Sequence, residues 1–244
     1  MMDPKFTFVL LALLAVPLAA RAQSANASKD LTGLNLKGVE ITKSELVPAG
    51  TMVPAPYPGA PAIGPLPAHC RIDGVINRRK GFGGQEFGIG FALALPQPEA
   101  WNGDFMMQGG GGGNGFVAYP TGSNYAGDAP ALTRGFAVAS TDTGHQAKTG
   151  AFDFSFMRDQ QAYLDFAFLA NAEVAALAKQ IIEHYYAKPP AYSYFVGCST
   201  GGREGMILSQ RYPAVFNGIV SGDPAMRTGL SNLTIAQWIP WMPW

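Results

Sequence analysis

The sequence of 244 residues is poor in charge, cysteine and histidine. Its 17 Lys and Arg residues balance 17 Asp and Glu residues, so the formal net charge is zero, and like charges do not form blocks. Nucleic acids and anionic membranes attract basic patches, so this balance argues against both partners and favours a neutral or small organic substrate. The two cysteines and three histidines show no zinc-site spacing, and no EF-hand-like loop occurs, so we expect no metal or cofactor in this segment.

Long apolar runs are also scarce. The first residues contain one, over residues 6–16, which follows Lys5 and precedes an A-x-A pattern ending at Ala22. This order is typical of a secretory signal peptide, so we predict a leader over residues 1–22 and a secreted or periplasmic mature protein that begins near Gln23. A short N-terminal anchor is the alternative, although the run is short for a bilayer span. No later segment is long and apolar enough for a transmembrane helix.

The length and a hydrophobic fraction of 48% allow one sizeable domain with a buried core. In the first half of the chain, strand-forming residues alternate with Gly, Pro and Asn. These signals predict mostly antiparallel strands over residues 39–42, 45–47, 70–77, 87–95 and 104–108. The stretch 54–67 is rich in Pro, Ala and Gly, so we predict a loop there, without a helix or an inner strand.

The second half of the chain alternates between strand and helix signals. Strands are predicted over residues 136–140, 192–196 and 218–221, with a helix from near Arg158 and another that ends near Tyr212. The first helix carries apolar residues at steps of three and four, namely Phe166, Ala170, Val174, Leu177, Ile181 and Tyr185. This alternation predicts an α/β fold with a mostly parallel sheet and flanking helices, preceded by the antiparallel strands.

The most informative motif is G-x-S-x-G, which follows the predicted strand 192–196. Its residues are Gly197, Cys198, Ser199, Thr200 and Gly201. Between a strand and a helix, this motif forms a strained turn that lifts the serine hydroxyl above the sheet edge, so Ser199 is the candidate nucleophile. A serine that merely caps the following helix is the alternative.

A second motif is the glycine run 109–113, which follows a predicted strand. Such a loop can present backbone N–H groups to a developing oxyanion, and one donor is worth about 3 kcal/mol of barrier. We predict that the N–H of Thr200 and that of Gly110 or Gly111 form this oxyanion hole. A flexible loop and a phosphate cradle are the alternatives. A phosphate cradle would need a Lys-Ser/Thr pair or a helix start after the glycines, and neither occurs.

The chain contains no histidine after Ser199, although in this architecture the triad runs from Ser through Asp or Glu to His. His145 follows the predicted strand 136–140, near the edge where active sites of α/β sheets gather, so it is the one candidate for a substitute base. A structural role in its loop is the simpler interpretation. His69 and His184 are interpreted as structural.

Several further segments accompany the two motifs. They are Leu46-Val47-Pro48-Ala49-Gly50, Ala68-His69-Cys70-Arg71, Trp101-Asn102-Gly103, Ser140-Thr141-Asp142-Thr143-Gly144-His145, Gln210-Arg211-Tyr212-Pro213 and residues 194–203 and 216–220. With these segments the chain resembles the tannase and feruloyl esterase family of secreted α/β-hydrolases, which includes mono(hydroxyethyl) terephthalate hydrolases. The resemblance covers nearly the whole mature chain.

The resemblance implies that Ser199 attacks an ester carbonyl and that Cys198 forms a disulfide with a cysteine beside the catalytic histidine. In the family that histidine, its cysteine, the catalytic aspartate, the lid domain and a calcium site of the lid all match positions beyond Trp244. The chain thus resembles the N-terminal part of such an enzyme, an incomplete α/β-hydrolase catalytic domain over residues 23–244. The start of a lid is expected near residues 227–244.

The cysteines show one departure from the family. Members usually have a cysteine just before the motif that begins here at Asp30, paired with the one that matches Cys70, whereas this chain has Ser28 and Lys29 there. Cys70 is therefore expected to be a free thiol. A Cys70–Cys198 disulfide is not expected.

Taken together, these features predict a serine carboxylic ester hydrolase that acts on small aromatic acid esters through an acyl-enzyme. Without a base for Ser199, we expect the chain as written to be inactive. The main alternative is a secreted, non-catalytic remnant that binds aromatic ligands or a partner. A serine peptidase of the same fold would need an oligopeptide-binding domain, for which the sequence shows no signal.

Overall fold

The computed structural model describes residues 36–54, 59, 61–122 and 129–226. Three sequence predictions lie outside these residues: the leader 1–22, the missing cysteine at Ser28 and Lys29, and the start of a lid in 227–244. Among the described helices, none has both the length and the apolar character required to cross a membrane.

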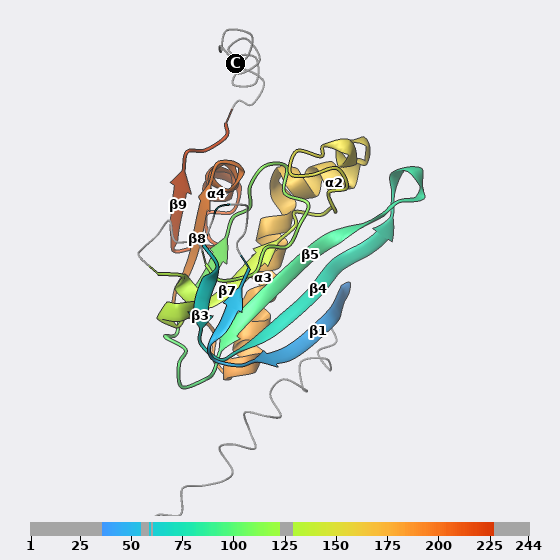
Figure 1. The fold of residues 1–244 in the computed structure, drawn as a ribbon. Helices are drawn as coiled ribbons and strands as arrows, with labels where there is room; N and C mark the ends of the chain where they lie inside the picture. The colour runs from blue at the N-terminus through green and yellow to red at the C-terminus, as the bar shows by residue number, and fades with distance from the viewer. Residues whose placement is uncertain (1–35, 55–58, 60, 123–128, 227–244) are drawn as a thin grey trace, which may run out of the picture.

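Within the described residues, seven strands form one mixed sheet (Figure 1). In spatial order they are β1 (Val39–Val47), β4 (His69–Lys80), β5 (Glu86–Pro96), β7 (Ala137–Thr141), β6 (Phe105–Gln108), β8 (Ser193–Cys198) and β9 (Gly218–Gly222). The pairings β1–β4, β4–β5 and β5–β7 are antiparallel, and β7–β6, β6–β8 and β8–β9 are parallel. The prediction of antiparallel N-terminal strands is confirmed for β1, β4 and β5 but is wrong for residues 104–108, because β6 pairs parallel with both of its neighbours. The sheet is therefore as much antiparallel as parallel in its pairings.

One helical segment follows β7 and another follows β8. The first consists of α2 (Gln160–Leu164), a π-helical turn (Asp165–Leu169) and α3 (Ala170–Tyr186), and the second is α4 (Thr200–Arg211). Helix α3 packs on β5 and β7 and α4 on β8 and β9, behind the sheet in the view of Figure 1. Short 3-10 turns cover Phe82–Gly84, Ala131–Arg134 and Ser155–Arg158.

The predicted apolar face of the long helix lies in the core. Ala170, Val174, Leu177 and Ile181 are buried there, where they join apolar residues of β4, β5 and β7. The helix begins two residues later than predicted because Asp159 is its N-cap: the Asp159 side chain accepts a 2.9 Å hydrogen bond from the N–H of Ala162.

The predicted loop 54–67 is wrong over its last residues, where β3 (Ile63–Leu66) pairs with β2 (Thr51–Val53) in a separate two-stranded sheet. Each strand of such a hairpin has an unpaired edge, so Pro65 removes no necessary hydrogen bond. Val53 and Leu66 are buried in a second apolar cluster with Met106 and Val138. The hairpin thus packs against the sheet through a cluster separate from the one that includes α3.

Candidate functional site

Ser199 occupies the turn between β8 and α4. The strand ends at Cys198 and the helix begins at Thr200, so Ser199 alone reverses the chain direction, with φ 58° and ψ −117°. A positive φ of this kind strains a residue other than glycine by about 1–3 kcal/mol and persists only where its surroundings enforce it. Here the Ser199 N–H donates to Gly222 at 3.0 Å and its carbonyl accepts from Ala225 at 3.0 Å. The side chain makes no capping hydrogen bond, so helix capping does not explain this serine.

The two glycines of the motif allow the strand and the helix to approach closely. A Cβ on Gly197 would lie 2.5 Å from the carbonyl carbon of Gly201, and one on Gly201 would lie 2.8 Å from the carbonyl oxygen of Gly110. Cβ atoms do not tolerate such separations. The sequence G-x-S-x-G is therefore a steric requirement of the turn.

The glycine run lies beside this turn. Gly109 donates to the carbonyl of Val196 at 2.8 Å, Gly201 donates to the carbonyl of Gly110 at 3.1 Å, and the hydroxyl of Thr200 donates to the carbonyl of Gly112. Two stretches that are about 90 residues apart in the sequence thus share one edge of the sheet. The predicted oxyanion residues and Ser199 are brought together there.

The two predicted glycine donors differ in their hydrogen bonding. The N–H of Gly110 donates to Oε2 of Glu204 at 3.2 Å, which removes Gly110 from the candidates for the oxyanion hole. Within the part of the chain that the structure describes, no hydrogen bond uses the N–H of Gly111 or that of Thr200. A Cβ added to Gly111 would meet no atom within 4 Å, so this residue borders open space.

Glu204 is a site residue that sequence reasoning missed. Its side chain is buried, with 3% of its surface exposed, and Oε1 accepts a 2.6 Å hydrogen bond from Nδ2 of Asn114. Burial raises the pKa of this carboxyl, while hydrogen bonds from Asn114, Gly110 and Asn171 oppose that shift. The only sequence signal that could have identified Glu204 is its position four residues after Thr200, which places both residues on the same face of α4. Glutamate on a helix is usually exposed, so that signal is weak.

The structure describes all three histidines of the chain, and none of them contacts Ser199 through a hydrogen bond. His145 is 1% exposed and stacks on the ring of Phe156 with 3.6 Å between centroids. Burial lowers its pKa to about 4, so the ring is neutral near pH 7. His69 is held between the carbonyl of Pro67 and the hydroxyl of Tyr119, each at 2.8 Å.

Both cysteines are free thiols, and no disulfide joins them. Cys70 is buried in the apolar core between the sheet and α3, and burial raises the pKa of its thiol to about 11. Cys198 is partly exposed beside Ser199. Among the described residues, no group of three His, Cys, Asp or Glu side chains is placed to hold a metal ion.

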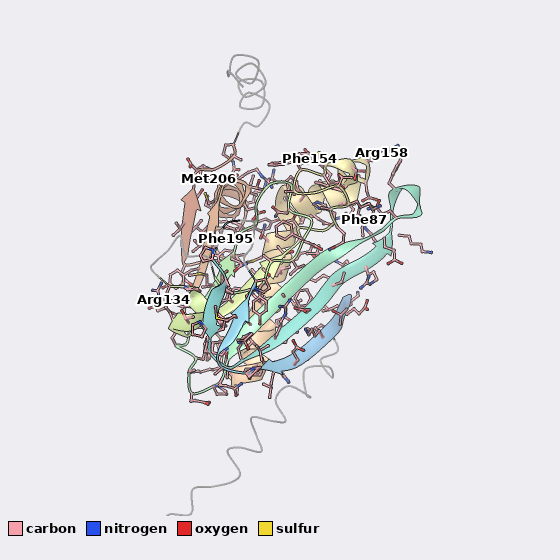
Figure 2. The ribbon with its side chains drawn as sticks, in the orientation of Figure 1. Phe87, Arg134, Phe154, Arg158, Phe195 and Met206 are labelled. Carbon is pink, nitrogen blue, oxygen red and sulfur yellow. The ribbon has the colours of Figure 1, made fainter. Side chains whose placement is uncertain are left out.

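Apolar side chains surround the same edge of the sheet. Figure 2 shows Met206 of α4 and Phe154 at the edge toward which β8 and β9 point in Figure 1. Phe154 is 44% exposed. Its ring lies next to Gly113, since a Cβ added to that glycine would be 3.0 Å from the ring. The candidate nucleophile, the unused N–H groups and an exposed aromatic ring therefore occupy one edge.

Known proteins share this arrangement of sequence and fold. The family model "Tannase and feruloyl esterase" matches residues 70–238. The mono(2-hydroxyethyl) terephthalate hydrolase of Piscinibacter sakaiensis is 39% identical over 231 residues, which cover 91% of this chain and 37% of that protein. A probable feruloyl esterase of Arthroderma benhamiae is 39% identical over 137 residues, which cover 54% of this chain and 24% of that protein.

Among solved structures, feruloyl esterase B from Aspergillus oryzae matches with a TM-score of 0.67 and 27% identity, over 83% of this chain and 37% of that one. The fold is thus an α/β-hydrolase fold, as the sequence predicted. The matches span between 24% and 37% of the length of these relatives.

Proposed function

The chain belongs to the tannase and feruloyl esterase family, and from this membership we propose that it carries the nucleophile half of a serine carboxylic ester hydrolase. The observation that supports this most directly is the strained turn at Ser199, with two unused backbone N–H groups beside it. A protein gains nothing structural from a strained, exposed serine, whereas a nucleophile requires one.

In the proposed reaction, Oγ of Ser199 attacks the ester carbonyl and a base takes the hydroxyl proton. The carbonyl oxygen becomes an oxyanion, which the N–H groups of Thr200 and Gly111 stabilise. The C–O bond to the alcohol then breaks, the alcohol leaves with a proton, and water releases the acid from the acyl-serine. The N–H of Thr200 also lies at the N-terminus of α4, where the helix dipole favours negative charge.

The base is the part that the described residues do not supply. We propose that a histidine and an aspartate outside this 244-residue sequence complete the triad. Cys198 would then form a disulfide with a cysteine beside that histidine. This disulfide would hold the histidine close to Ser199. This accords with the lengths of the relatives, of which the matches cover between 24% and 37%. The chain by itself would then be inactive.

We propose aromatic acid esters as the substrates. The relatives are named for terephthalate and feruloyl esters, whose acids contain an aromatic ring. In this chain the exposed ring of Phe154 beside the glycine run offers a stacking surface for such an acid. We also propose secretion or export to the periplasm, which the leader pattern over residues 1–22 supports and which accords with extracellular esters as substrates.

The decisive experiment compares this chain with a version extended through the downstream reading frame. Both are assayed on methyl ferulate, methyl gallate and para-nitrophenyl acetate, each with a Ser199→Ala control. Activity in the extended protein alone, abolished by Ser199→Ala, is the expected result.

Other outcomes change the conclusion. Serine-dependent activity in the short chain would mean that a described residue supplies the base, with His145 the first to replace. No activity in either protein would overturn the esterase proposal and favour a non-catalytic protein that binds aromatic ligands.

A further inference from the structure

One buried carboxylate joins the glycine run to the nucleophile helix. Oε2 of Glu204 accepts from the N–H of Gly110 at 3.2 Å, and Oε1 accepts from Nδ2 of Asn114 at 2.6 Å. Asn171 of α3 also lies close enough to this carboxylate to oppose the rise in its pKa. Glu204 thus contacts both ends of the segment 110–114 and a neighbouring helix. A carboxylate buried this deeply is costly unless its acceptor positions are used, and here they are used by the glycine loop.

These contacts bracket Gly111 between two residues that are bonded to α4. Gly110 is held through its N–H by Glu204 and through its carbonyl by the N–H of Gly201. Gly112 is held through its carbonyl by the hydroxyl of Thr200. The intervening N–H of Gly111 therefore has its position determined by α4, although it belongs to another part of the chain.

The same helix also carries the second proposed donor. Thr200 and Glu204 are four residues apart, so they lie on one face of α4. A rigid helix turn thus sets the spacing between the N–H of Thr200 and the anchor of the glycine loop. An oxyanion hole needs donors that keep their position before charge develops, because reorganisation during the reaction would cost part of the stabilisation.

We infer that Glu204 is a positioning residue that holds the glycine loop so that the N–H of Gly111 points with that of Thr200 toward the oxyanion. This inference rests on the proposed esterase function. The positioning role requires a carboxylate, because the N–H of Gly110 and the Nδ2 of Asn114 each donate to a different oxygen of Glu204. A glutamine at this position has one acceptor oxygen, and its NH₂ group would face a second donor across the loop.

The test compares Glu204→Gln with a matched control, Asp159→Asn, in the enzyme extended through the downstream reading frame. Asp159 is also buried, at 7% exposed, and accepts hydrogen bonds from Ala162, Phe82 and Arg79, but it holds the β4–β5 hairpin rather than the glycine loop. Both variants should unfold at a lower temperature.

For methyl ferulate hydrolysis, we expect Glu204→Gln to lower kcat per folded molecule about 10- to 100-fold, with KM changed less than about 3-fold, because the lost interaction stabilises the transition state. Asp159→Asn should leave kcat within about 2-fold of wild type. Equal kcat losses in the two variants, or an unchanged kcat in Glu204→Gln, would overturn the inference.

Amide hydrogen exchange on the same proteins separates this inference from the proposed function. Glu204→Gln should accelerate exchange within residues 109–114, whereas Asp159→Asn should accelerate it near Phe82 and at the start of α2. If the wild-type enzyme shows no Ser199-dependent activity, the proposed function fails. If the enzyme is active but residues 109–114 exchange at the wild-type rate in Glu204→Gln, the positioning role fails.

Discussion

Arg203 donates a 3.0 Å hydrogen bond from Nη2 to the carbonyl oxygen of Phe166, and its Nη1 donates to the carbonyl of Ala167 at 3.2 Å. Both carbonyls belong to the π-helical turn Asp165–Leu169, and the guanidinium also lies over the ring of Phe166, 4.4 Å from its centroid. The residue before Glu204 on α4 thus binds the irregular turn of the long helix. Two adjacent residues of α4 therefore bind different parts of the fold: Arg203 binds the π-helical turn and Glu204 binds the glycine run.

Replacing Arg203 tests the value of this contact. We expect Arg203→Ala to lower the free energy of unfolding by about 2 kcal/mol, because a charged donor to two partly buried carbonyls is lost. Arg211→Ala is the matched control, since Arg211 is exposed and stacks on Phe168 of the same turn, so a loss under about 1 kcal/mol is expected there. Urea denaturation measures the free energy of unfolding of both variants. Equal losses would show that the hydrogen bonds of Arg203 to the turn add no stability.

Neighbouring glycines in the run should respond differently to alanine. Gly111→Ala should change the free energy of unfolding by less than about 1 kcal/mol, because its added Cβ meets open space. Gly112→Ala should cost about 2 kcal/mol or more, since Gly112 has φ +58° and its Cβ would collide with the carbonyl oxygen of Ala151. Thermal or urea denaturation of the two variants provides the comparison. A Gly111→Ala protein as unstable as Gly112→Ala would mean that Gly111 does not border open space.

The positive φ at Ser199 predicts that glycine at this position is more stable than any residue with a Cβ. Ser199→Gly should be about 1 kcal/mol more stable than Ser199→Ala, because glycine adopts φ 58° without strain and alanine does not. Ala187→Gly, at the end of α3 with φ 57°, should show a gain of similar size and serves as a positive control. Urea denaturation at one pH measures all three. A glycine variant no more stable than the alanine variant would show that the turn at Ser199 is unstrained.

The burial of His145 predicts that this residue contributes less to stability in mild acid than at neutral pH. Its pKa in the folded protein is lowered to about 4, so between pH 6.5 and pH 4 the unfolded chain binds a proton that the folded protein does not. The contribution of His145 to stability should therefore decrease as the pH falls through this window. From pH 7 to pH 5 the contribution of His145 is about 2 kcal/mol of unfolding free energy.

The measurement is the stability difference between the wild type and His145→Gln at the two pH values. Burial raises the pKa of nearby Asp142 to about 7, which acts in the opposite direction, but this residue is present in both proteins and its effect cancels in the difference. The advantage of the wild type at pH 7 should shrink by about 2 kcal/mol at pH 5. A constant difference would show that His145 titrates normally in the folded protein.

Much of the fold follows from local patterns. The strand-to-helix turn at Ser199 was predictable because its glycines, its strand and its helix are contiguous in sequence. The long helix was predictable because its apolar residues repeat every three or four positions. The hairpin strand β3 was missed because proline normally excludes strands, and only its position in an isolated pair makes Pro65 acceptable there.

The chain sequence by itself determined the fold class, the candidate nucleophile and the glycine run beside it, because each is encoded in a short contiguous pattern. Tertiary structure alone decided which glycine N–H is unused, that Glu204 holds the loop from 90 residues away, and that His145 is buried away from Ser199. The physical reason is that hydrogen bonding and burial depend on groups brought together by folding. The identity of a residue therefore does not show which distant groups it will contact in the folded protein.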